Sequence, residues 1–205
     1  MNQYVQVWLF ISSDHGGNFL GNYIRGILLY ISMNHKIRKI KEPDLKKIVE
    51  IENTAYGKYG WSYNIFKSEI LNSSSIYLAS EINQTDKLKI IGYIGAWLIQ
   101  DEGHITTLVV DKDYRRQHYA DILLYTLIHN LLKYPIRWIT LEVKVSNTPA
   151  INLYKKFLFN EIGIRKHYYQ DNNEDALILW SNDISNINYI QHIESIFNKI
   201  INADK

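Results

Sequence analysis

LVVDKDYRRQHYADILL, residues 108–124, is the stretch that decides the fold, and LEVKVSNTPAINLYKKFLF, residues 141–159, repeats its plan. In each stretch a run rich in β-branched and apolar residues predicts a strand, a short polar turn follows, and apolar residues at helical spacing predict a helix. A strand that leads directly into a helix directs unpaired backbone N–H groups and the positive end of the helix dipole to one point, where a phosphate is held well. Two such units side by side predict a phosphate-bearing cofactor between them.

The composition is that of an ordinary globular protein. Hydrophobic residues make up 46% of the 205 residues and charged residues 21%. The formal net charge of +2 gives no reason to expect nucleic acid as a direct ligand. The absence of cysteine excludes disulfides, thiolate metal sites and an acyl-cysteine intermediate. The seven histidines show no ligand spacing, so no metal is expected, and no apolar run reaches the length of a membrane span.

The turn at residues 115–120, RRQHYA, resembles the signature of the GNAT superfamily of acetyl-CoA-dependent N-acetyltransferases. In that signature a hydrophobic strand precedes Arg or Gln, two residues of any kind, Gly, any residue, and then Gly or Ala. Downstream, LEVKVSN, LYKKFLF and YYQDNNEDALILW look like the RimI-type branch, which acetylates the N-terminus of a ribosomal protein. The resemblance covers about residues 36–180 and implies an α/β (α+β) GNAT fold, with a mixed central sheet of splayed strands flanked by helices.

This interpretation divides the chain into three parts. Residues 1–33 form an N-terminal extension of unknown role, residues 34–182 hold the acetyltransferase domain, and residues 183–205 hold an amphipathic helix. The sequence leaves open whether that helix packs back on the domain, joins two subunits into an oligomer or meets a partner.

Within the domain, Pro43 marks the start of a first helix that ends before Gly57, and Ser62 is the expected N-cap of a second. Thr148 is the expected N-cap of the helix that follows the strand at 138–145. The other expected strands are 36–40, 76–82, 88–99, 103–110, 161–165 and 176–180, with a polar turn at 83–87 and a nine-residue loop, HYYQDNNED, between the last two.

The resemblance implies which residues hold acetyl-CoA. Backbone groups at Leu108, Val109 and Val110, on a bulged strand that splays from its neighbour, pair with the pantetheine arm, and Asn147 bonds the same arm. The pyrophosphate lies against the turn and helix start formed by Arg115, Arg116, Gln117, His118, Tyr119, Ala120 and Asp121. The sequence departs from the family at His118 and Leu158, which stand where glycine is usual.

By the same resemblance Glu142 is the general base and Tyr154 the general acid. A carboxylate beside an amine accepts the ammonium proton, directly or through water, and partial burial raises its pKa, while a phenol beside the thioester protonates the departing thiolate. The structural alternatives are a Glu142 that faces solvent or pairs with Lys144, and a Tyr154 that only fills the core.

Aromatic residues are the candidates for contact with the acceptor. Trp61 lies in the loop between the first two helices, which forms one wall of the acceptor groove in the family, and Tyr56 and Tyr59 are near it. Tyr168 and Tyr169 lie in the loop that covers the acceptor in the RimI-type branch. The alternative for each is a role in packing alone.

The implied function is transfer of acetyl from acetyl-CoA to the α-amine of a protein or peptide N-terminus, with a ribosomal protein as the candidate acceptor. Two alternatives stay open: a lysine or small-amine acetyltransferase, and a degenerate acyl-CoA-binding or interaction protein, since both family glycines are replaced. Abundant Asn, Ile, Lys and Tyr indicate an AT-rich genome. A bacterial cytoplasm and a plastid (chloroplast) stroma both fit as the location.

Overall fold

A computed structural model of the chain describes residues 35–84 and 87–203. The N-terminal extension expected at 1–33, and part of the polar turn expected at 83–87, lie outside the described residues. The elements in chain order are β1 (His35–Lys39), the 3-10 turn η1 (Glu42–Asp44), α2 (Leu45–Tyr56), η2 (Gly57–Tyr59), α3 (Tyr63–Leu71), β2 (Ser75–Gln84), β3 (Lys87–Ile99), β4 (Glu102–Val110), η3 (Lys112–Tyr114), α4 (Tyr119–Leu131), β5 (Trp138–Lys144), α5 (Thr148–Lys156), β6 (Phe159–Tyr169), β7 (Glu174–Ser181) and α6 (Ile187–Ala203).

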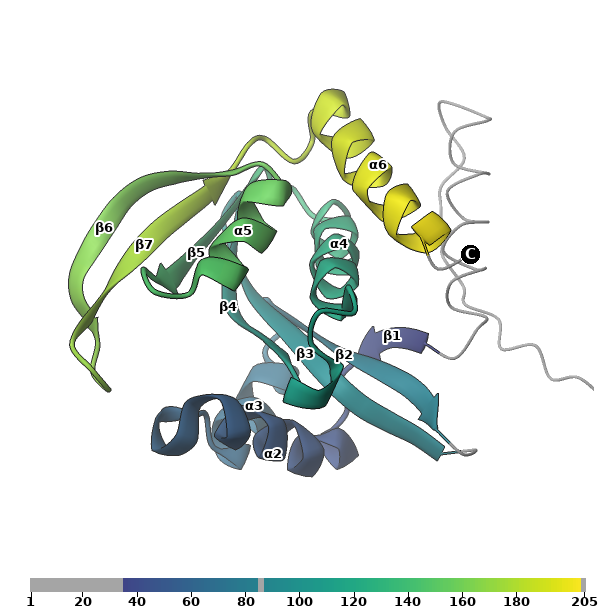
Figure 1. Ribbon diagram of the computed structural model, residues 1–205, viewed down its shortest axis with the longest axis vertical. Coiled ribbons are helices and arrows are strands. Elements are labelled where there is room, and N and C mark those ends of the chain that lie inside the picture. The colour runs from purple at the N-terminus through teal and green to yellow at the C-terminus, as the bar shows by residue number, and fades with distance from the viewer. Residues whose placement is uncertain (1–34, 85–86, 204–205) are drawn as a thin grey trace, which may run out of the picture.

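The strands form one seven-stranded sheet in the order β1-β2-β3-β4-β5-β7-β6 (Figure 1). Every neighbouring pair is antiparallel except β4 and β5, which are parallel and joined by the crossover helix α4. The mixed sheet with flanking helices expected from the sequence is therefore confirmed.

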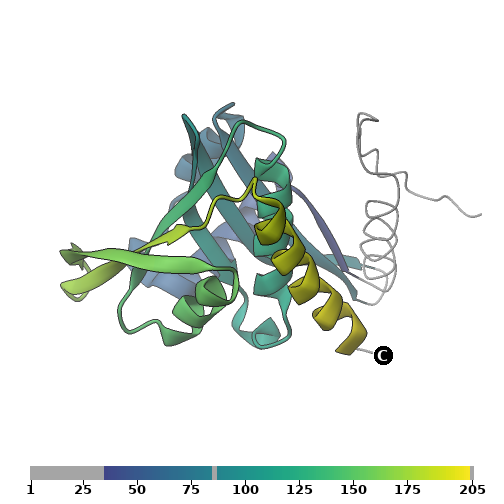
Figure 2. The same cartoon turned by 90° about the horizontal axis from the view of Figure 1, so that it is seen from above.

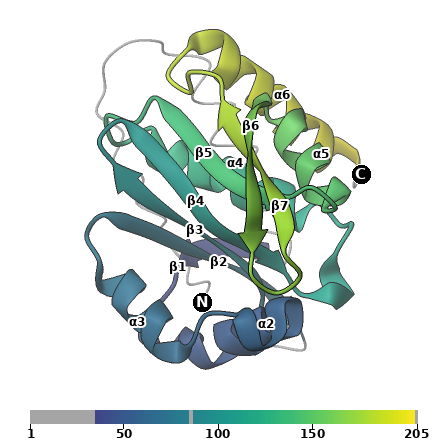
Figure 3. The same cartoon turned by 90° about the vertical axis from the view of Figure 1, so that its left-hand side faces the viewer.

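The two central strands β4 and β5 separate soon after they meet. Only Glu102–His104 of β4 pair with Trp138–Thr140 of β5. Beyond these residues β4 remains paired with β3, and β5 remains paired with β7 (Figure 3). The facing edges of the two strands therefore carry backbone groups that the sheet does not pair, and these groups need another partner.

A bulge in β4 accompanies this separation. Gly95 of β3 pairs with Thr107, and Ala96 pairs with Ile105, so Thr106 is the extra residue. The bulge was expected near Leu108 and lies two residues before it. Because a bulge bends its strand and increases the local twist, Thr106 turns the end of β4 away from β5.

Helices cover both faces of the sheet. Helices α2 and α3 pack on one face around Phe66 and Tyr93, and α4 and α5 pack on the other face around a cluster that includes Leu123 and Phe157 (Figures 1 and 3). The path between β4 and β5 therefore lies between two separately packed layers, and a ligand that enters there meets both.

Helix α6 packs back on α4, which is one of the three arrangements that the sequence left open (Figure 2). Its apolar stripe is buried, with Ile193 at 0% exposure, and the ring of Phe197 stacks on Tyr125 with centroids 4.2 Å apart. The Tyr125 hydroxyl also donates a hydrogen bond to Glu194 at 3.0 Å. Among the described residues, no helix combines the length and the apolar character needed to cross a bilayer.

Of the two helix caps that the sequence predicted, one is confirmed and one is corrected. Ser62 caps α3 by accepting a hydrogen bond from the N–H of Ile65, as expected. The cap of α5 is Asn147 rather than Thr148: the Asn147 side chain accepts from the N–H of Ala150 at 3.2 Å, which leaves Thr148 as the first helical residue.

The closing hairpin is longer than expected. Strands β6 and β7 pair out to Tyr169 and Glu174, so most of the expected nine-residue loop belongs to the strands. Asp175 fixes this extension, since it accepts a hydrogen bond from the N–H of His167 at 2.9 Å and pairs with Lys166 at 2.7 Å. The register slips between Arg165 and Tyr169, and a slip of this kind interrupts the alternation by which a strand is recognised in a sequence.

Candidate active site

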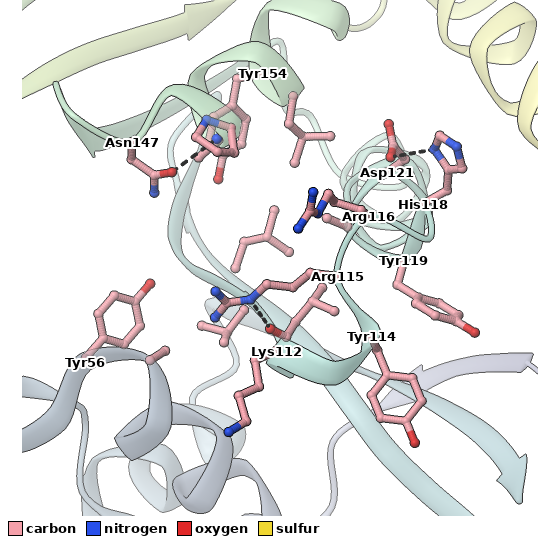
Figure 4. A pocket seen from close by; sticks show the side chains of 18 residues that line it. Tyr56, Lys112, Tyr114, Arg115, Arg116, His118, Tyr119, Asp121, Asn147 and Tyr154 are labelled. Carbon is pink, nitrogen blue, oxygen red and sulfur yellow. Dashed lines mark hydrogen bonds and ion pairs between the residues drawn. The ribbon is translucent and has the colours of Figure 1, made fainter.

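A cavity of about 1080 Å³ opens where β4 and β5 separate (Figure 4). The end of β4, the turn that follows it and the start of α4 form one wall, α5 forms the opposite wall, and the end of α2 closes one side. Most of the residues expected to hold a cofactor line this cavity, namely Leu108, Val109, Val110, Arg115, Arg116, His118, Tyr119, Ala120, Asp121 and Asn147. The expected general acid, Tyr154, lines it as well.

The turn before α4 has the backbone geometry of an anion-binding loop. Arg116 and His118 both adopt positive φ, of 60° and 62°, so the chain is left-handed on either side of Gln117. The first N–H groups of α4 follow at once, and the start of a helix leaves such groups without partners in the helix. Left-handed turns and a helix start together present several N–H groups to one anion.

His118 adopts the left-handed conformation for which glycine is usually selected, and its side chain does not block the anion-binding turn. Its side chain is 50% exposed, and its Nδ1 lies 3.2 Å from Oδ2 of Asp121. Figure 4 shows the ring turned toward Asp121 and away from Arg115. A Cβ at positive φ costs about 1 kcal/mol, and histidine tolerates that region better than bulkier residues do.

The cavity wall near this turn is positively charged. Lys112, Arg115 and Arg116 line it, and the one carboxylate among the lining residues, Asp121, is paired with Lys156 at 2.6 Å. The Nε of Arg115 donates to the carbonyl oxygen of Val110 at 3.1 Å, which leaves the two terminal guanidinium nitrogens available (Figure 4). That hydrogen bond also occupies a β4 carbonyl that was expected to pair with the cofactor.

Gln117 is the one residue of the expected phosphate-binding set that does not line the cavity. Its side chain donates a hydrogen bond to the carbonyl oxygen of Asp113 at 3.4 Å, which links Gln117 to the start of the turn. Its contribution is therefore confined to the backbone of the loop.

Sequence reasoning missed several lining residues of α5 and of the turn. Helix α5 presents Pro149, Ala150 and Leu153 on the same helical face as the predicted Tyr154. Helical periodicity counted from Tyr154 was the signal that would have found them. Lys112 lies in the same basic turn as the two arginines, and its charge was the available signal there.

Tyr154 is buried at the α5 wall, with 5% exposure, and its ring packs against Phe159 at 5.4 Å between centroids. Burial raises the pKa of the Tyr154 phenol well above the ordinary tyrosine value, and the nearby phenols of Tyr56 and Tyr169 raise it further. Tyr154 therefore remains protonated across the physiological pH range.

Glu142 lies on β5, outside the cavity lining, with its side chain 8% exposed. Its two carboxylate oxygens have different partners: Oε2 lies 3.2 Å from Nε2 of His104, and Oε1 lies 3.0 Å from Nη2 of Arg165. The expected alternative pairing with Lys144 does not occur, because Lys144 pairs with Asp171 at 2.5 Å. The two contacts fix the orientation of the Glu142 carboxylate, so Glu142 is not a solvated surface residue.

His104 is itself held in place. Its Nδ1 lies 2.9 Å from the hydroxyl oxygen of Thr140, and the indole of Trp97 stacks on its ring at 6.0 Å. A histidine with both ring nitrogens engaged has a fixed orientation, and so has the carboxylate that it contacts. The sequence gave no sign of this pairing, because His104 and Glu142 come from different strands.

The candidates for acceptor contact divide into two groups. Tyr169 lies close to Glu142, since its hydroxyl donates to the backbone oxygen of Glu142 at 3.4 Å, and Tyr168 beside it is 44% exposed. Trp61 instead is partly buried, packs on Phe66 at 5.6 Å and does not line the cavity. The hairpin tyrosines are therefore accessible to an acceptor near Glu142, whereas Trp61 packs against the edge of the core under α3.

Across residues 35–84 and 87–203, no group of three or more His, Asp or Glu side chains is arranged to hold a metal ion.

Comparison with known proteins places these features in a family context. The sequence pattern of the family described as Acetyltransferase (GNAT) family matches residues 35–159. The putative [ribosomal protein bS18]-alanine N-acetyltransferase of Bacillus subtilis (strain 168) is 36% identical over 145 residues, which cover 70% of this chain and 93% of the relative. The [ribosomal protein bS18]-alanine N-acetyltransferase of Escherichia coli (strain K12) is 34% identical, with coverage of 70% and 94%.

A solved structure agrees with these relatives. The crystal structure of the ribosomal-protein-S18-alanine N-acetyltransferase from Escherichia coli matches with a TM-score of 0.64 and 32% identity. The match covers 72% of this chain and 92% of that chain. The similarity thus extends over nearly the whole of each shorter relative.

Proposed function

The chain belongs to the GNAT family of N-acetyltransferases and uses acetyl-CoA as its acetyl donor, and from this premise we propose that the acceptor is the α-amine of a protein N-terminus, that of a ribosomal protein. The observation that carries the proposal is the similarity, over 93% and 94% of their length, to two bacterial enzymes whose names specify N-acetylation of an alanine of ribosomal protein bS18. The accessible hairpin beside Glu142 supports it from the structure.

The residues of the cavity fit the donor. The charged turn with Arg115 and Arg116 suits the pyrophosphate, and the unpaired edge of β4 at Leu108 and Val109 suits the amide groups of the pantetheine arm. The side-chain oxygen of Asn147 caps α5, so its amide nitrogen is the group available to the same arm. These residues hold the donor with its acyl end toward Tyr154.

Glu142 and Tyr154 carry out the two proton transfers in this proposal. Acetyl-CoA supplies an activated thioester; the amine nitrogen bonds to its carbonyl carbon, and the carbon–sulfur bond breaks. Glu142 accepts the ammonium proton, and Tyr154, kept protonated by burial, donates its proton to the departing thiolate. An N–H group on the open edge of β4 donates to the carbonyl oxygen and stabilises the negative charge that develops there.

An α-amine suits this machinery better than a lysine does. The pKa of an α-amine is about 8, roughly 2.5 units below that of lysine, so less free energy is needed to deprotonate it near neutral pH. His104 and Arg165 orient the Glu142 carboxylate. Tyr168 and Tyr169, at the end of the hairpin, lie where an acceptor peptide would come close to Glu142. The proposal therefore assigns the acceptor to the side of the sheet on which Glu142 lies.

The reaction requires a compartment that contains both acetyl-CoA and ribosomal proteins. The two ribosomal-protein acetyltransferases that this chain resembles at 36% and 34% identity come from bacteria, which supports a bacterial cytoplasm. A plastid stroma meets the same requirement, and the AT-rich coding of the chain is compatible with it.

Thiol release from acetyl-CoA tests the proposal. A thiol-reactive dye reports the free CoA, and the absence of cysteine means that the enzyme adds no signal of its own. The acceptors are peptides with free or blocked N-termini, peptides with internal lysines, and small amines. Release only from peptides with a free N-terminus is expected, and equal release from a blocked peptide that contains lysine would contradict the proposal.

A further inference from the structure

A second cavity, of about 550 Å³, lies between the end of α5 and the helix α6. His118, the N-cap of α4, completes its wall. Figures 2 and 3 show α6 lying beside the helices that carry the first cavity. Because the family pattern ends at residue 159, α6 is a part of this chain that the pattern does not include.

The walls of this second cavity combine an apolar floor with a cationic rim. Leu158, Ile196 and Ile200 form the floor, and Lys155 and Lys199 stand on the rim with the two histidines. Its lining contains no carboxylate. A floor of this kind suits the face of a planar aromatic base, and the rim suits a phosphate.

The lysines differ in their availability. Lys156 is paired with Asp121 at 2.6 Å, and Lys155 is paired with Glu161 at 2.8 Å. Lys199 is exposed and forms no ion pair with any described residue. On the same helix, the Nε2 of His192 lies 3.0 Å from the carbonyl oxygen of Lys156, which ties α6 to the end of α5. Lys199 is therefore the cation that is free to bind an added anion.

The two cavities meet at His118, which lines both. The phosphate-binding turn at 115–118 thus ends where the second cavity begins. Acetyl-CoA carries, beyond its pyrophosphate, a ribose with a 3′-phosphate and an adenine. A donor held with its pyrophosphate on the turn has this end within reach of the second cavity.

We propose that the second cavity binds the 3′-phosphate-bearing adenosine end of acetyl-CoA, with the adenine on the apolar floor and the phosphate monoester on Lys199. The inference rests on the use of acetyl-CoA in the proposed function and is independent of the acceptor. It makes α6 part of the donor site, in addition to its packing against α4.

Calorimetric titration of CoA and of 3′-dephospho-CoA into the full chain tests the assignment. The variant is Lys199→Met, and the matched control is Lys133→Met, a lysine after α4 that lines neither cavity. Wild type should bind CoA more tightly than 3′-dephospho-CoA. Lys199→Met should weaken CoA binding about fivefold, the effect of one partly exposed charge pair, and leave 3′-dephospho-CoA binding unchanged.

Several outcomes would overturn the assignment. Equal loss for both ligands would mean that Lys199 acts through general electrostatics or through the fold, and the Lys133→Met control and thermal melting would show which. A wild-type preference that survives Lys199→Met would place the 3′-phosphate elsewhere. Equal binding of both ligands by wild type would refute recognition of the 3′-phosphate while leaving the acetyltransferase function intact, whereas no binding of either ligand would refute both proposals.

Discussion

Replacing Tyr154 with phenylalanine removes one oxygen atom from a side chain that is 5% exposed and lines the proposed donor cavity. The ring keeps its contact with Phe159, and no described residue forms a hydrogen bond with the hydroxyl. The free energy of unfolding should therefore change by less than about 1 kcal/mol, because neither packing nor a hydrogen bond is lost. A large effect on activity would then be an effect on chemistry.

The expected effect on catalysis follows from the proposed role of Tyr154 as the general acid. Loss of a general acid costs about 100-fold or more in kcat, which corresponds to roughly 2.7 kcal/mol of the activation free energy. The KM for acetyl-CoA should change little. Because burial raises the pKa of Tyr154, wild-type kcat should show no fall from phenol ionisation up to about pH 9.5.

Thiol release and thermal melting measure the two effects on the same preparations. Tyr189→Phe is the matched control, since Tyr189 is 2% exposed, its hydroxyl lacks a hydrogen-bond partner among the described residues, and it lines neither cavity. The control should retain wild-type kcat. A Tyr154→Phe enzyme that keeps more than about half of wild-type kcat would refute the assignment of the general acid.

Three further predictions follow from the described contacts. Glu142→Gln should lower kcat by about 100-fold or more while acetyl-CoA binding stays unchanged, as calorimetry and thiol release will show. Burial lowers the pKa of His35 to about 4, so between about pH 6.5 and pH 4 the unfolded chain binds a proton that the folded chain does not. As the pH is lowered through this range, the free energy of unfolding should therefore decrease by up to about 3 kcal/mol. In denaturant titrations, His35→Gln should show a smaller decrease. Gly95→Ala should destabilise the fold by about 3 kcal/mol in the same assay, since the added Cβ would lie 2.1 Å from Cε1 of the buried Tyr77.

Each of these predictions has a control. Glu50→Gln, at an exposed residue of α2, should keep full activity, and a Glu142→Gln enzyme as active as that control would remove Glu142 from its role. A pH dependence of stability that His35→Gln leaves unaltered would assign it to other groups. For the glycine, Gly163→Ala is matched, because its added Cβ would meet only Ile178 at 3.6 Å. Similar destabilisation by the two alanine variants would contradict the proposed clash with Tyr77.

Most of the residues that the sequence predicts for the donor line one cavity, because most of the wall of that cavity is local in the chain. A strand, a basic turn and a helix start are adjacent, so the strand pattern of β4 and the charges of Arg115 and Arg116 are sufficient to predict which residues share this wall. His118 and Leu158, which stand where the family usually has glycine, both adopt left-handed conformations, with φ values of 62° and 59°.

The parts that the sequence missed depend on long-range contacts. The partners of Glu142 are His104 on β4 and Arg165 on β6, and no local pattern relates these three residues. The bulge at Thr106 and the register slips of β6 likewise depend on pairing with a neighbouring strand. Asn147 and Thr148 are both good N-caps, so which of the two begins α5 depends on how the helix packs.

The most direct test of the acceptor assignment uses one peptide that carries both a free α-amine and an internal lysine, with the N-terminal sequence of a ribosomal protein that begins with alanine. The peptide is incubated with the enzyme and acetyl-CoA, and tandem mass spectrometry locates the added acetyl group. The account predicts acetylation of the N-terminal nitrogen, at a rate that Glu142→Gln lowers by about 100-fold or more. Acetyl on the lysine alone would contradict it.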